Sequence, residues 1–559
     1  MRGTGKRMEA TFNRRVDRRS VIAAVAVCAC TIIGAAFRLC GIGWELPGKL
    51  HKFTYHPDEI FQVGSIINLN PFALKLDPGF FNYPSGYMNL ASAVMRLAEA
   101  YGMKIDDASV YLIARLVTAS LGILTIPVIY LLGRRLFGFA VGLIACLIYA
   151  IMPLCIVHSH FATVDVPSAF WTTCAILAAA AILSKPTTKN CIIAGLAAGI
   201  AAGTKYNCAL VLLSVLTAIV ISKRNNPKGN VVLSVVISII GTIIGLLVAS
   251  PGILIWPNKY VSGFLYELGH AAAGHGLVFA GRGPGWLDVL SSAFGFGLGV
   301  PILAASLLAV ALAITRHRRE DWMILAFAVP YFMLIAFSQV RFTRYAIPLM
   351  PPVAVLIARL MIEIYELLHH QQVRIAKVGW ALCSIGIIVY TILYAAALTK
   401  LFTMPDPRNQ AFKWLKENAP PSTSVGLATV PWFYSPPYTP EINGLPSAWD
   451  RYKEMSKSPW RLVIGTGENE GNLPSWQASV PATDRPMYII ISDYEYEDAL
   501  RIREPNALEF MRQVAANYIE KTIFAPRLQF IGLDFGAAEQ LPHDLKYMAP
   551  TIHIYQRRR

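Results

Sequence analysis

The sequence predicts an α-helical polytopic membrane protein with about eleven transmembrane helices and a C-terminal α/β domain outside the membrane. Of the 559 residues, 55% are hydrophobic and only 15% are charged, and the mean hydropathy is +0.47. Long apolar runs recur over residues 21–400, and a helix needs roughly 20 apolar residues to cross a bilayer. From residue 401 onward the chain is more polar and alternates helix and strand patterns.

Basic residues in the short connections predict the orientation of the spans. The connections "GRRLFG", "SKPTTKN", "SKRNNPKGN", "TRHRRED" and "HHQQVRIAK" all carry Lys or Arg. If the basic N-terminus, residues 1–20, is cytoplasmic, all five lie inside, as the positive-inside rule requires. We therefore expect a protein of the cell (inner) membrane with a periplasmic C-terminal domain. The predicted spans are 21–41, 109–132, 138–157, 166–184, 191–203, 205–221, 231–255, 286–314, 322–338, 345–364 and 378–400.

Residues 191–221 test this topology, because they run between two basic loops and must cross an even number of times. Two short helices that meet at "GTKYN" satisfy the requirement. The alternative is one long helix, which would invert every later span and place the following basic loops outside.

The net charge of +16 does not indicate a nucleic-acid partner, because of where the charge lies. Residues 401–559 carry 17 basic and 18 acidic side chains, so the excess lies among the spans, where it reports orientation. Nine cysteines all precede residue 384, and no CxxC pair occurs. The C-terminal part is therefore expected to lack disulfides, and no cysteine zinc site is predicted.

Long polar segments are predicted on the side opposite the basic loops. The first periplasmic loop, 42–108, contains "PSGYMNLASAVMRLAEAYG", whose apolar spacing predicts an amphipathic helix at the membrane interface. A second periplasmic loop is 256–285. In the domain 401–559, "NQAFKWLKENAP" and "NALEFMRQVAANY" predict helices, and "SVGLATV" and "MYIIISD" predict buried strands.

Ionisable side chains gather at the outer ends of the spans. Such a group at membrane depth costs about 2.5–3.5 kcal/mol on insertion scales, so it usually faces a polar cavity with a partner. The motifs are "YHPDEIFQ", "HSHFATVDVP", "GTKYN", "ELGHAAAGHG" and "QVRFTRYAIP". The candidate residues in them are Asp58, Glu59, His158, His160, Asp165, Lys205, His270, His275, Arg341, Arg344 and Tyr345.

Each candidate has a structural alternative. The acidic pair after the first span could be solvated loop acids, and Asp165 could cap the helix that follows it. Lys205 could extend to the interface, and the two arginines could be interface anchors. His270 and His275, five residues apart, do not share a helix face, so a metal site is not predicted. All of the candidates are nevertheless predicted to lie on the same side of the membrane, and this favours one shared site.

A carboxylate among cations at a lipid interface suggests a specific reaction. The cations would hold a lipid phosphate through charge-assisted hydrogen bonds, and the carboxylate would take a proton from an attacking hydroxyl. With a sugar on that phosphate, the outcome is glycosyl transfer. Inversion needs one base on the face opposite the leaving group, unlike the paired carboxylates of most glycosidases.

These motifs resemble a known family. "YHPDEIFQ", "HSHFATVDVPSAFWTTCAILAAA", "AGIAAGTKYN" and "RFTRYAIPLMPPVAVLIARL" resemble, in order and spacing, segments of the membrane glycosyltransferases with the GT-C fold. Within that fold the chain resembles the dolichyl-phosphate-mannose protein mannosyltransferases (glycosyltransferase family 39) and the bacterial aminoarabinose transferases. The resemblance covers residues 20–400.

The resemblance implies a polyprenyl-phosphate-linked sugar donor and a hydroxyl acceptor on protein, lipid or glycan at the outer face. It implies that no cofactor is required, and a divalent metal is not predicted. Asp58 would be the general base, and Glu59 would position the acceptor or support Asp58. The remaining candidates would bind substrate: Asp165 lining the cavity, Lys205, Arg341 and Arg344 at the donor phosphate, and His160, His270, His275 and Tyr345 more loosely.

One feature departs from the family, and two alternatives stay open. No loop is long enough for the β-trefoil domains of the eukaryotic mannosyltransferases, which leaves the acceptor open. The Trp-Trp-Asp signature of oligosaccharyltransferases is also absent, with "WDRY" at 449–452 nearest to it. An oligosaccharide-transferring relative is one alternative. The other is a transporter or flippase, because intramembrane charges and broken helices also mark substrate pathways.

Overall fold

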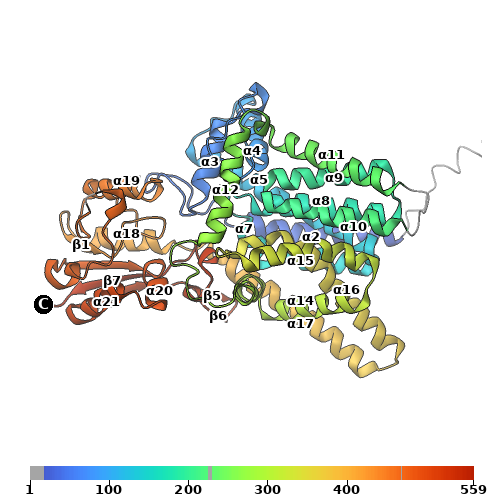
Figure 1. Ribbon diagram of the computed structural model, residues 1–559. Helices are drawn as coiled ribbons and strands as arrows, with labels where there is room; N and C mark the ends of the chain where they lie inside the picture. The colour runs from blue at the N-terminus through green and yellow to red at the C-terminus, as the bar shows by residue number, and fades with distance from the viewer. Residues whose placement is uncertain (1–17, 224–229, 468) are drawn as a thin grey trace, which may run out of the picture.

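The computed structural model describes residues 18–223, 230–467 and 469–559, as a helical bundle with a sheet domain at one end (Figure 1). The expected basic N-terminus, residues 1–20, lies almost entirely outside the described residues. Seven helices in the described ranges are long and apolar enough to cross a membrane. They are α2 (Arg18–Leu39), α5 (Asp107–Phe137), α8 (Asp165–Ser184), α11 (Val231–Ala249), α15 (Arg319–Phe337), α16 (Met350–His370) with the 3-10 turn η5 (Thr343–Leu349), and α17 (Arg374–Leu401).

Shorter helices complete the bundle. They are α6 (Phe139–Ala150), α7 (Pro153–His158), α9 (Thr188–Thr204), η2 (Tyr206–Val211), α10 (Leu212–Ser222), α13 (Gly285–Val289) and α14 (Val300–Arg316). Each of the eleven predicted spans overlaps helices of these two groups, but some are divided, since 138–157 covers α6 and α7 and 286–314 covers α13 and α14.

The predicted break at "GTKYN" is present. Helix α9 ends at Thr204, Lys205 is extended with φ −151° and ψ 123°, and η2 begins at Tyr206. Helix α11, which follows the break in the chain, packs closely on α9, which precedes it. The two helices meet through facing glycines, and a Cβ at Gly199 would collide with the carbonyl oxygen of Thr242. Small residues allow such close helix contacts in membranes. The alternative of one continuous helix over 191–221 is therefore wrong.

Three further helices form the end of the bundle nearest the sheet domain: α3 (Glu59–Asn68), α4 (Gly86–Ala100) and α12 (Pro257–Ala273). The predicted amphipathic helix is α4, which buries Tyr87 and Met88 and exposes Val94 and Leu97. Helix α12 stands between the sheet domain and the bundle (Figure 1). The sequence analysis assigned no helix to the α3 and α12 segments.

The C-terminal domain contains a five-stranded sheet in the order β2-β1-β3-β7-β4. The first three strands are parallel, and β7 is antiparallel to both of its neighbours, β3 and β4. Strand β3 is buried on both faces, which explains its unbroken apolar sequence. The strands are β1 (Ser424–Leu427), β2 (Arg461–Val463), β3 (Tyr488–Ser492), β4 (Tyr518–Phe524) and β7 (Ile552–Arg557). The domain's main helices are α18 (Pro407–Asn418), α19 (Ala448–Glu454), α20 (Asp493–Arg501) and α21 (Pro505–Asn517).

Several contacts hold this domain on the bundle, and two of them involve its hairpin and α18. The hairpin of β5 (Arg527–Phe530) and β6 (Leu533–Ala537) packs on α17, where the ring of Phe535 lies 5.6 Å from that of Tyr394. Arg408 of α18, fully buried, pairs with Asp406 at 2.6 Å, and its guanidinium lies 3.8 Å from the ring centroid of Tyr55 in the first loop. The domain is thereby placed over the end of the bundle that carries the polar loops.

Candidate active site

Two adjoining cavities lie where the bundle, the first loop and the C-terminal domain meet. The first, of about 610 Å³, is lined by Asp58, by Arg344 and by aromatic side chains of the C-terminal domain. The second, of about 340 Å³, is mainly apolar, and Lys205 is among its lining residues. The two share a wall made of Asn82, Tyr83, Glu267, His270 and Tyr345. The first cavity, called the polar cavity below because of its charged lining residues, therefore meets the more apolar second cavity, called the apolar cavity, at one set of side chains.

Asp58 faces the polar cavity immediately before α3. Its Oδ2 lies 2.8 Å from Nη2 of Arg344, and its side chain keeps 31% of its exposure. Partial removal from water raises the pKa of Asp58, and the nearby carboxylates of Asp165 and Asp544 add to this, against the attraction of Arg344. The carboxylate is accessible from the cavity and more basic than an ordinary aspartate.

Glu59 points elsewhere. It is fully buried and accepts hydrogen bonds from Nε and Nη2 of Arg115 at 2.8 and 2.7 Å. Thr54 Oγ1 donates to it at 2.6 Å, and the backbone N–H of Ala162 donates at 2.7 Å. These four donors occupy both carboxylate oxygens, and Glu59 lines neither cavity. This geometry anchors the first turn of α3, and the predicted role of Glu59 toward an acceptor stays a prediction.

Asp165 and Lys205 form a buried ion pair. Oδ1 of Asp165 lies 2.6 Å from Nζ of Lys205, with 4% and 6% of the side chains exposed. Asp165 starts α8 without capping it, so the pairing replaces the capping alternative. Lys205 is buried, and its Nζ lies 4.6 Å from the ring centroid of Tyr345. The pair places one cation at the wall of the apolar cavity.

The two predicted arginines point in different directions. The guanidinium of Arg344 lies 4.0 Å from the ring centroid of Phe342 and faces Asp58. Nε of Arg341 instead pairs with Asp288 of α13 at 2.8 Å, and its other nitrogens donate to backbone carbonyls. Arg341 lines neither cavity. Its predicted role at a phosphate is therefore not supported, because its charge is already compensated by Asp288.

The predicted histidines lie in different places, and His270 and His275 are at the site. Helix α12 ends at Ala273, the chain turns at Gly274 with φ +97°, and Nδ1 of His275 comes within 2.9 Å of Nε2 of His270. Both line the polar cavity. Burial, with His270 and Arg344 adding to it, lowers the pKa of His275 to about 4, so this ring is neutral at pH 7.

His160 is not at the site. Its Nδ1 and Nε2 each lie 2.9 Å from a backbone carbonyl oxygen, of Ile156 and Cys40 respectively, and its ring stacks on Phe402 at 4.0 Å. It is fully buried and lines neither cavity. Both ring nitrogens of His160 therefore already face backbone carbonyl oxygens, and its predicted contact with substrate stays a prediction.

The sequence analysis missed several residues of the site. Glu267 of α12 lines both cavities, and burial raises its pKa to about 7. Helical spacing from Glu267 to His270 was the signal that could have found it. The C-terminal domain contributes Tyr494, His543 and Tyr547 to the polar cavity. No sequence signal connects these residues to a membrane site, because their approach depends on domain docking.

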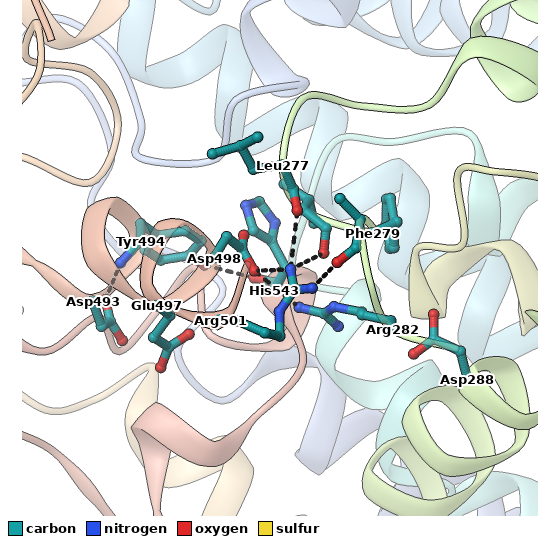
Figure 2. A network of polar contacts seen from close by, with 12 residues as sticks. Leu277, Phe279, Arg282, Asp288, Asp493, Tyr494, Glu497, Asp498, Arg501 and His543 are labelled. Carbon is teal, nitrogen blue, oxygen red and sulfur yellow. Dashed lines mark hydrogen bonds and ion pairs between the residues drawn. The ribbon is translucent and has the colours of Figure 1, made fainter. Parts of the chain in front are cut away.

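One wall of the polar cavity is a loop held by the C-terminal domain (Figure 2). Arg501 of α20 donates to the carbonyl oxygens of Leu277 at 2.9 Å and Val278 at 3.1 Å. Asp498 of the same helix pairs with Arg501 at 2.7 Å and with Arg282 of the loop at 3.5 Å. The loop that carries His275 is thus tied to α20.

Within residues 18–223, 230–467 and 469–559, no group of three His, Cys, Asp or Glu side chains is placed to hold a metal ion.

Comparison with known proteins gives two kinds of match. Residues 94–256 match the family model described as dolichyl-phosphate-mannose-protein mannosyltransferase. No curated protein matches the sequence. Among solved structures, the apo oligosaccharyltransferase of Archaeoglobus fulgidus superimposes with a TM-score of 0.51 at 13% identity, over 96% of this chain and 78% of that one.

A second solved structure, ArnT from Cupriavidus metallidurans bound to undecaprenyl phosphate, has a TM-score of 0.45 at 14% identity, over 95% of this chain and 97% of that one. The chain therefore has the fold of the GT-C glycosyltransferases and, over residues 94–256, the sequence pattern of the dolichyl-phosphate-mannose-protein mannosyltransferase family.

Proposed function

We propose that the protein is an inverting glycosyltransferase that moves a sugar from a polyprenyl-phosphate-linked donor to an acceptor hydroxyl at the outer face of the membrane. One observation carries the proposal. The accessible carboxylate of Asp58, paired with Arg344, lines the polar cavity, which shares a wall with the apolar one. A hydroxyl acceptor from the aqueous side and a lipid-borne sugar from the membrane side would meet at this point.

The donor would enter through the apolar cavity. Its walls suit an isoprenoid chain, and two cations flank Tyr345 at its inner end. Nζ of Lys205 lies 4.6 Å and Cζ of Arg344 lies 5.6 Å from the centroid of that ring. A phosphate placed there would take charge-assisted hydrogen bonds from both. The name of the matching family model, which specifies a dolichyl-phosphate-linked mannose, supports this class of donor.

Asp58 would act as the general base. The acceptor oxygen attacks the anomeric carbon as its proton passes to Asp58, and the bond from that carbon to the phosphate oxygen breaks. The electron pair leaves with the polyprenyl phosphate. Protonation of Asp58 removes its charge from Arg344. The guanidinium would then be released toward the phosphate at the moment when negative charge develops there.

The other lining residues would bind substrate. Tyr345 and His270 border both cavities, and His275 borders the polar one, so they would contact the sugar or the acceptor. Asp165 would act through Lys205 by holding its Nζ at the phosphate position. Glu59 would act through the backbone by fixing the segment that carries Asp58.

The test is mass spectrometry of polyprenyl-phosphate lipids and envelope glycans in cells that express wild type, Asp58→Asn, Asp77→Asn or no protein. Asp77 is a matched control, because it lies in the same loop, outside both cavities, and pairs with exposed Lys259. We expect one polyprenyl-phosphate sugar to accumulate, and one glycan to lose that sugar, in the Asp58→Asn and deletion strains only.

Two other results would reject parts of the proposal. If Asp58→Asn matches wild type while the deletion shows the defect, Asp58 is not the base. If no strain changes any glycan or lipid-linked sugar, the transferase proposal fails and the transporter hypothesis, which the comparisons do not favour, must be tested.

A further inference from the structure

A third cavity, a groove of about 560 Å³, lies at the end of the bundle away from the candidate site. It runs between α5, α8 and α9, and its walls include Leu131, Leu177 and Ile193. Helix α8 begins at the site with Asp165 and reaches the groove only in its second half. The groove is therefore separate from both cavities described above.

The groove has an apolar part and a cationic end, which complement the acyl chain and the phosphate of a phospholipid. Along α8 its wall extends from Cys174 to Ala181, a rise of about 10 Å at 1.5 Å per residue. This part is apolar and opens sideways, since Leu131 is 49% exposed and Ile193 is 46% exposed. Ile192, the neighbour of Ile193 on α9, is 42% exposed. At the end of the groove nearest the C-terminus of α5 lie the exposed side chains of Arg134 and Arg135, in the last turn of that helix. An acyl chain would fit the apolar part, with its headgroup at the arginines.

These two arginines carry uncompensated charge. Arg134 donates to the hydroxyl of Tyr130 at 3.2 Å, and neither arginine pairs with a carboxylate in the described part of the chain. The sequence from 108 to 266 contains only one acidic residue, Asp165, which is paired with Lys205.

Three other arginines near the ends of the spans are compensated. Arg316 and Arg318 pair with Glu363, at 3.5 and 2.9 Å, and Arg359 pairs with Asp321 and Glu363. The groove therefore differs from its surroundings in combining an apolar slot with two cations that lack a carboxylate partner among the described residues.

We propose that this groove is a binding site for an anionic diacyl phospholipid of the phosphatidylglycerol class. Arg134 and Arg135 would hold the headgroup phosphate, and one acyl chain would lie along Leu131 and Leu177. Charge complementarity selects this occupant, because basic pockets between transmembrane helices bind anionic headgroups. Zwitterionic phospholipids would bind less well, since their own ammonium group competes for the phosphate. The proposal does not depend on the proposed reaction.

The experiment uses the full-length, delipidated protein in detergent. Binding of dioleoylphosphatidylglycerol and of dioleoylphosphatidylcholine would be measured by native mass spectrometry, together with the shift in melting temperature. The variants are R134Q/R135Q and, as a control, R374Q/K377Q, which removes two exposed or half-exposed charges from α17 outside the groove. Leu177→Trp fills the groove and keeps both charges.

We expect wild type to bind the phosphatidylglycerol more tightly than the phosphatidylcholine, and R134Q/R135Q to lose about 30-fold in that affinity, from two cations at about 1 kcal/mol each. Leu177→Trp should also lose the binding, and R374Q/K377Q should keep it. Equal losses in both charge variants would overturn the proposal, as would equal binding of the two lipids. Displacement of the phosphatidylglycerol by undecaprenyl phosphate at equal concentration would also overturn it. If R134Q/R135Q does not fold, Leu177→Trp against the control decides the question.

Discussion

The carboxylate of Asp544, on the C-terminal domain, accepts the backbone N–H of Arg344 at 3.0 Å, at the membrane end of the candidate site. Its other oxygen accepts the N–H of Thr343 at 3.1 Å, and Oδ2 lies 3.6 Å from Nη1 of Arg344. Asp544 is 1% exposed. The domain thus inserts a buried carboxylate that orients the arginine paired with Asp58, and the site is complete only when the domain is docked.

Asp544→Asn should lower the rate of sugar transfer about 10- to 100-fold. The amide group offers one acceptor where two N–H groups need one each, so Arg344 would shift, and small displacements of positioning groups have effects of this size. The measurement is the initial rate of the purified full-length enzyme, with separate kcat and KM for the acceptor. Asp534→Asn, on the exposed hairpin, is the control. Equal rates in the two variants would contradict the positioning role.

Lys205→Met should weaken donor binding about tenfold and also destabilise the fold. The fold effect arises because Asp165 would remain buried without its partner, at a cost of about 3–5 kcal/mol. The double variant K205M/D165N removes both charges and should recover most of the stability without recovering donor affinity. Thermal unfolding and donor titration would separate the two effects. Recovery of donor affinity in the double variant would show that Lys205 does not bind the phosphate.

Glu59→Gln should lower stability much more than Asp58→Asn does. Glu59 and Arg115 are both fully buried, and breaking such a pair costs about 3–5 kcal/mol, whereas Asp58 keeps 31% of its exposure. Thermal unfolding of the purified variants checks the difference. A Glu59→Gln enzyme that is as stable as wild type but inactive would instead place Glu59 in direct contact with substrate.

The protein should lose stability between pH 5 and pH 8 through Glu267. Burial raises the pKa of this carboxyl to about 7, so the folded state favours the protonated form. That stabilisation is fully present below the ordinary pKa and is lost as the pH rises through about 7. Glu267→Gln should therefore raise the melting temperature by roughly 2–4 °C at pH 8 relative to wild type, with little change at pH 5.

The control for that experiment is Glu99→Gln, since Glu99 is exposed on α4 and pairs with Arg96 at 2.9 Å. A parallel shift in both variants, or no pH dependence in Glu267→Gln, would contradict the assignment.

The sequence by itself determined the helical spans, the break at Lys205 and the elements of the C-terminal domain that were predicted. It did so because apolar length, helical period and strand alternation are local properties. It also placed Asp58, Lys205 and Arg344 at the ends of spans, since a buried charge in an apolar run is visible without a structure.

Only the tertiary structure decided which charged groups meet. Arg341 and Arg344 are three residues apart, yet one pairs with Asp288 and the other with Asp58. Glu59 adjoins Asp58, yet it is bound by Arg115 on another helix. The contribution of Asp544 comes from 200 residues beyond Arg344 in the chain. These outcomes depend on packing between distant segments, and each ion pair forms where burial makes an unpaired charge most costly.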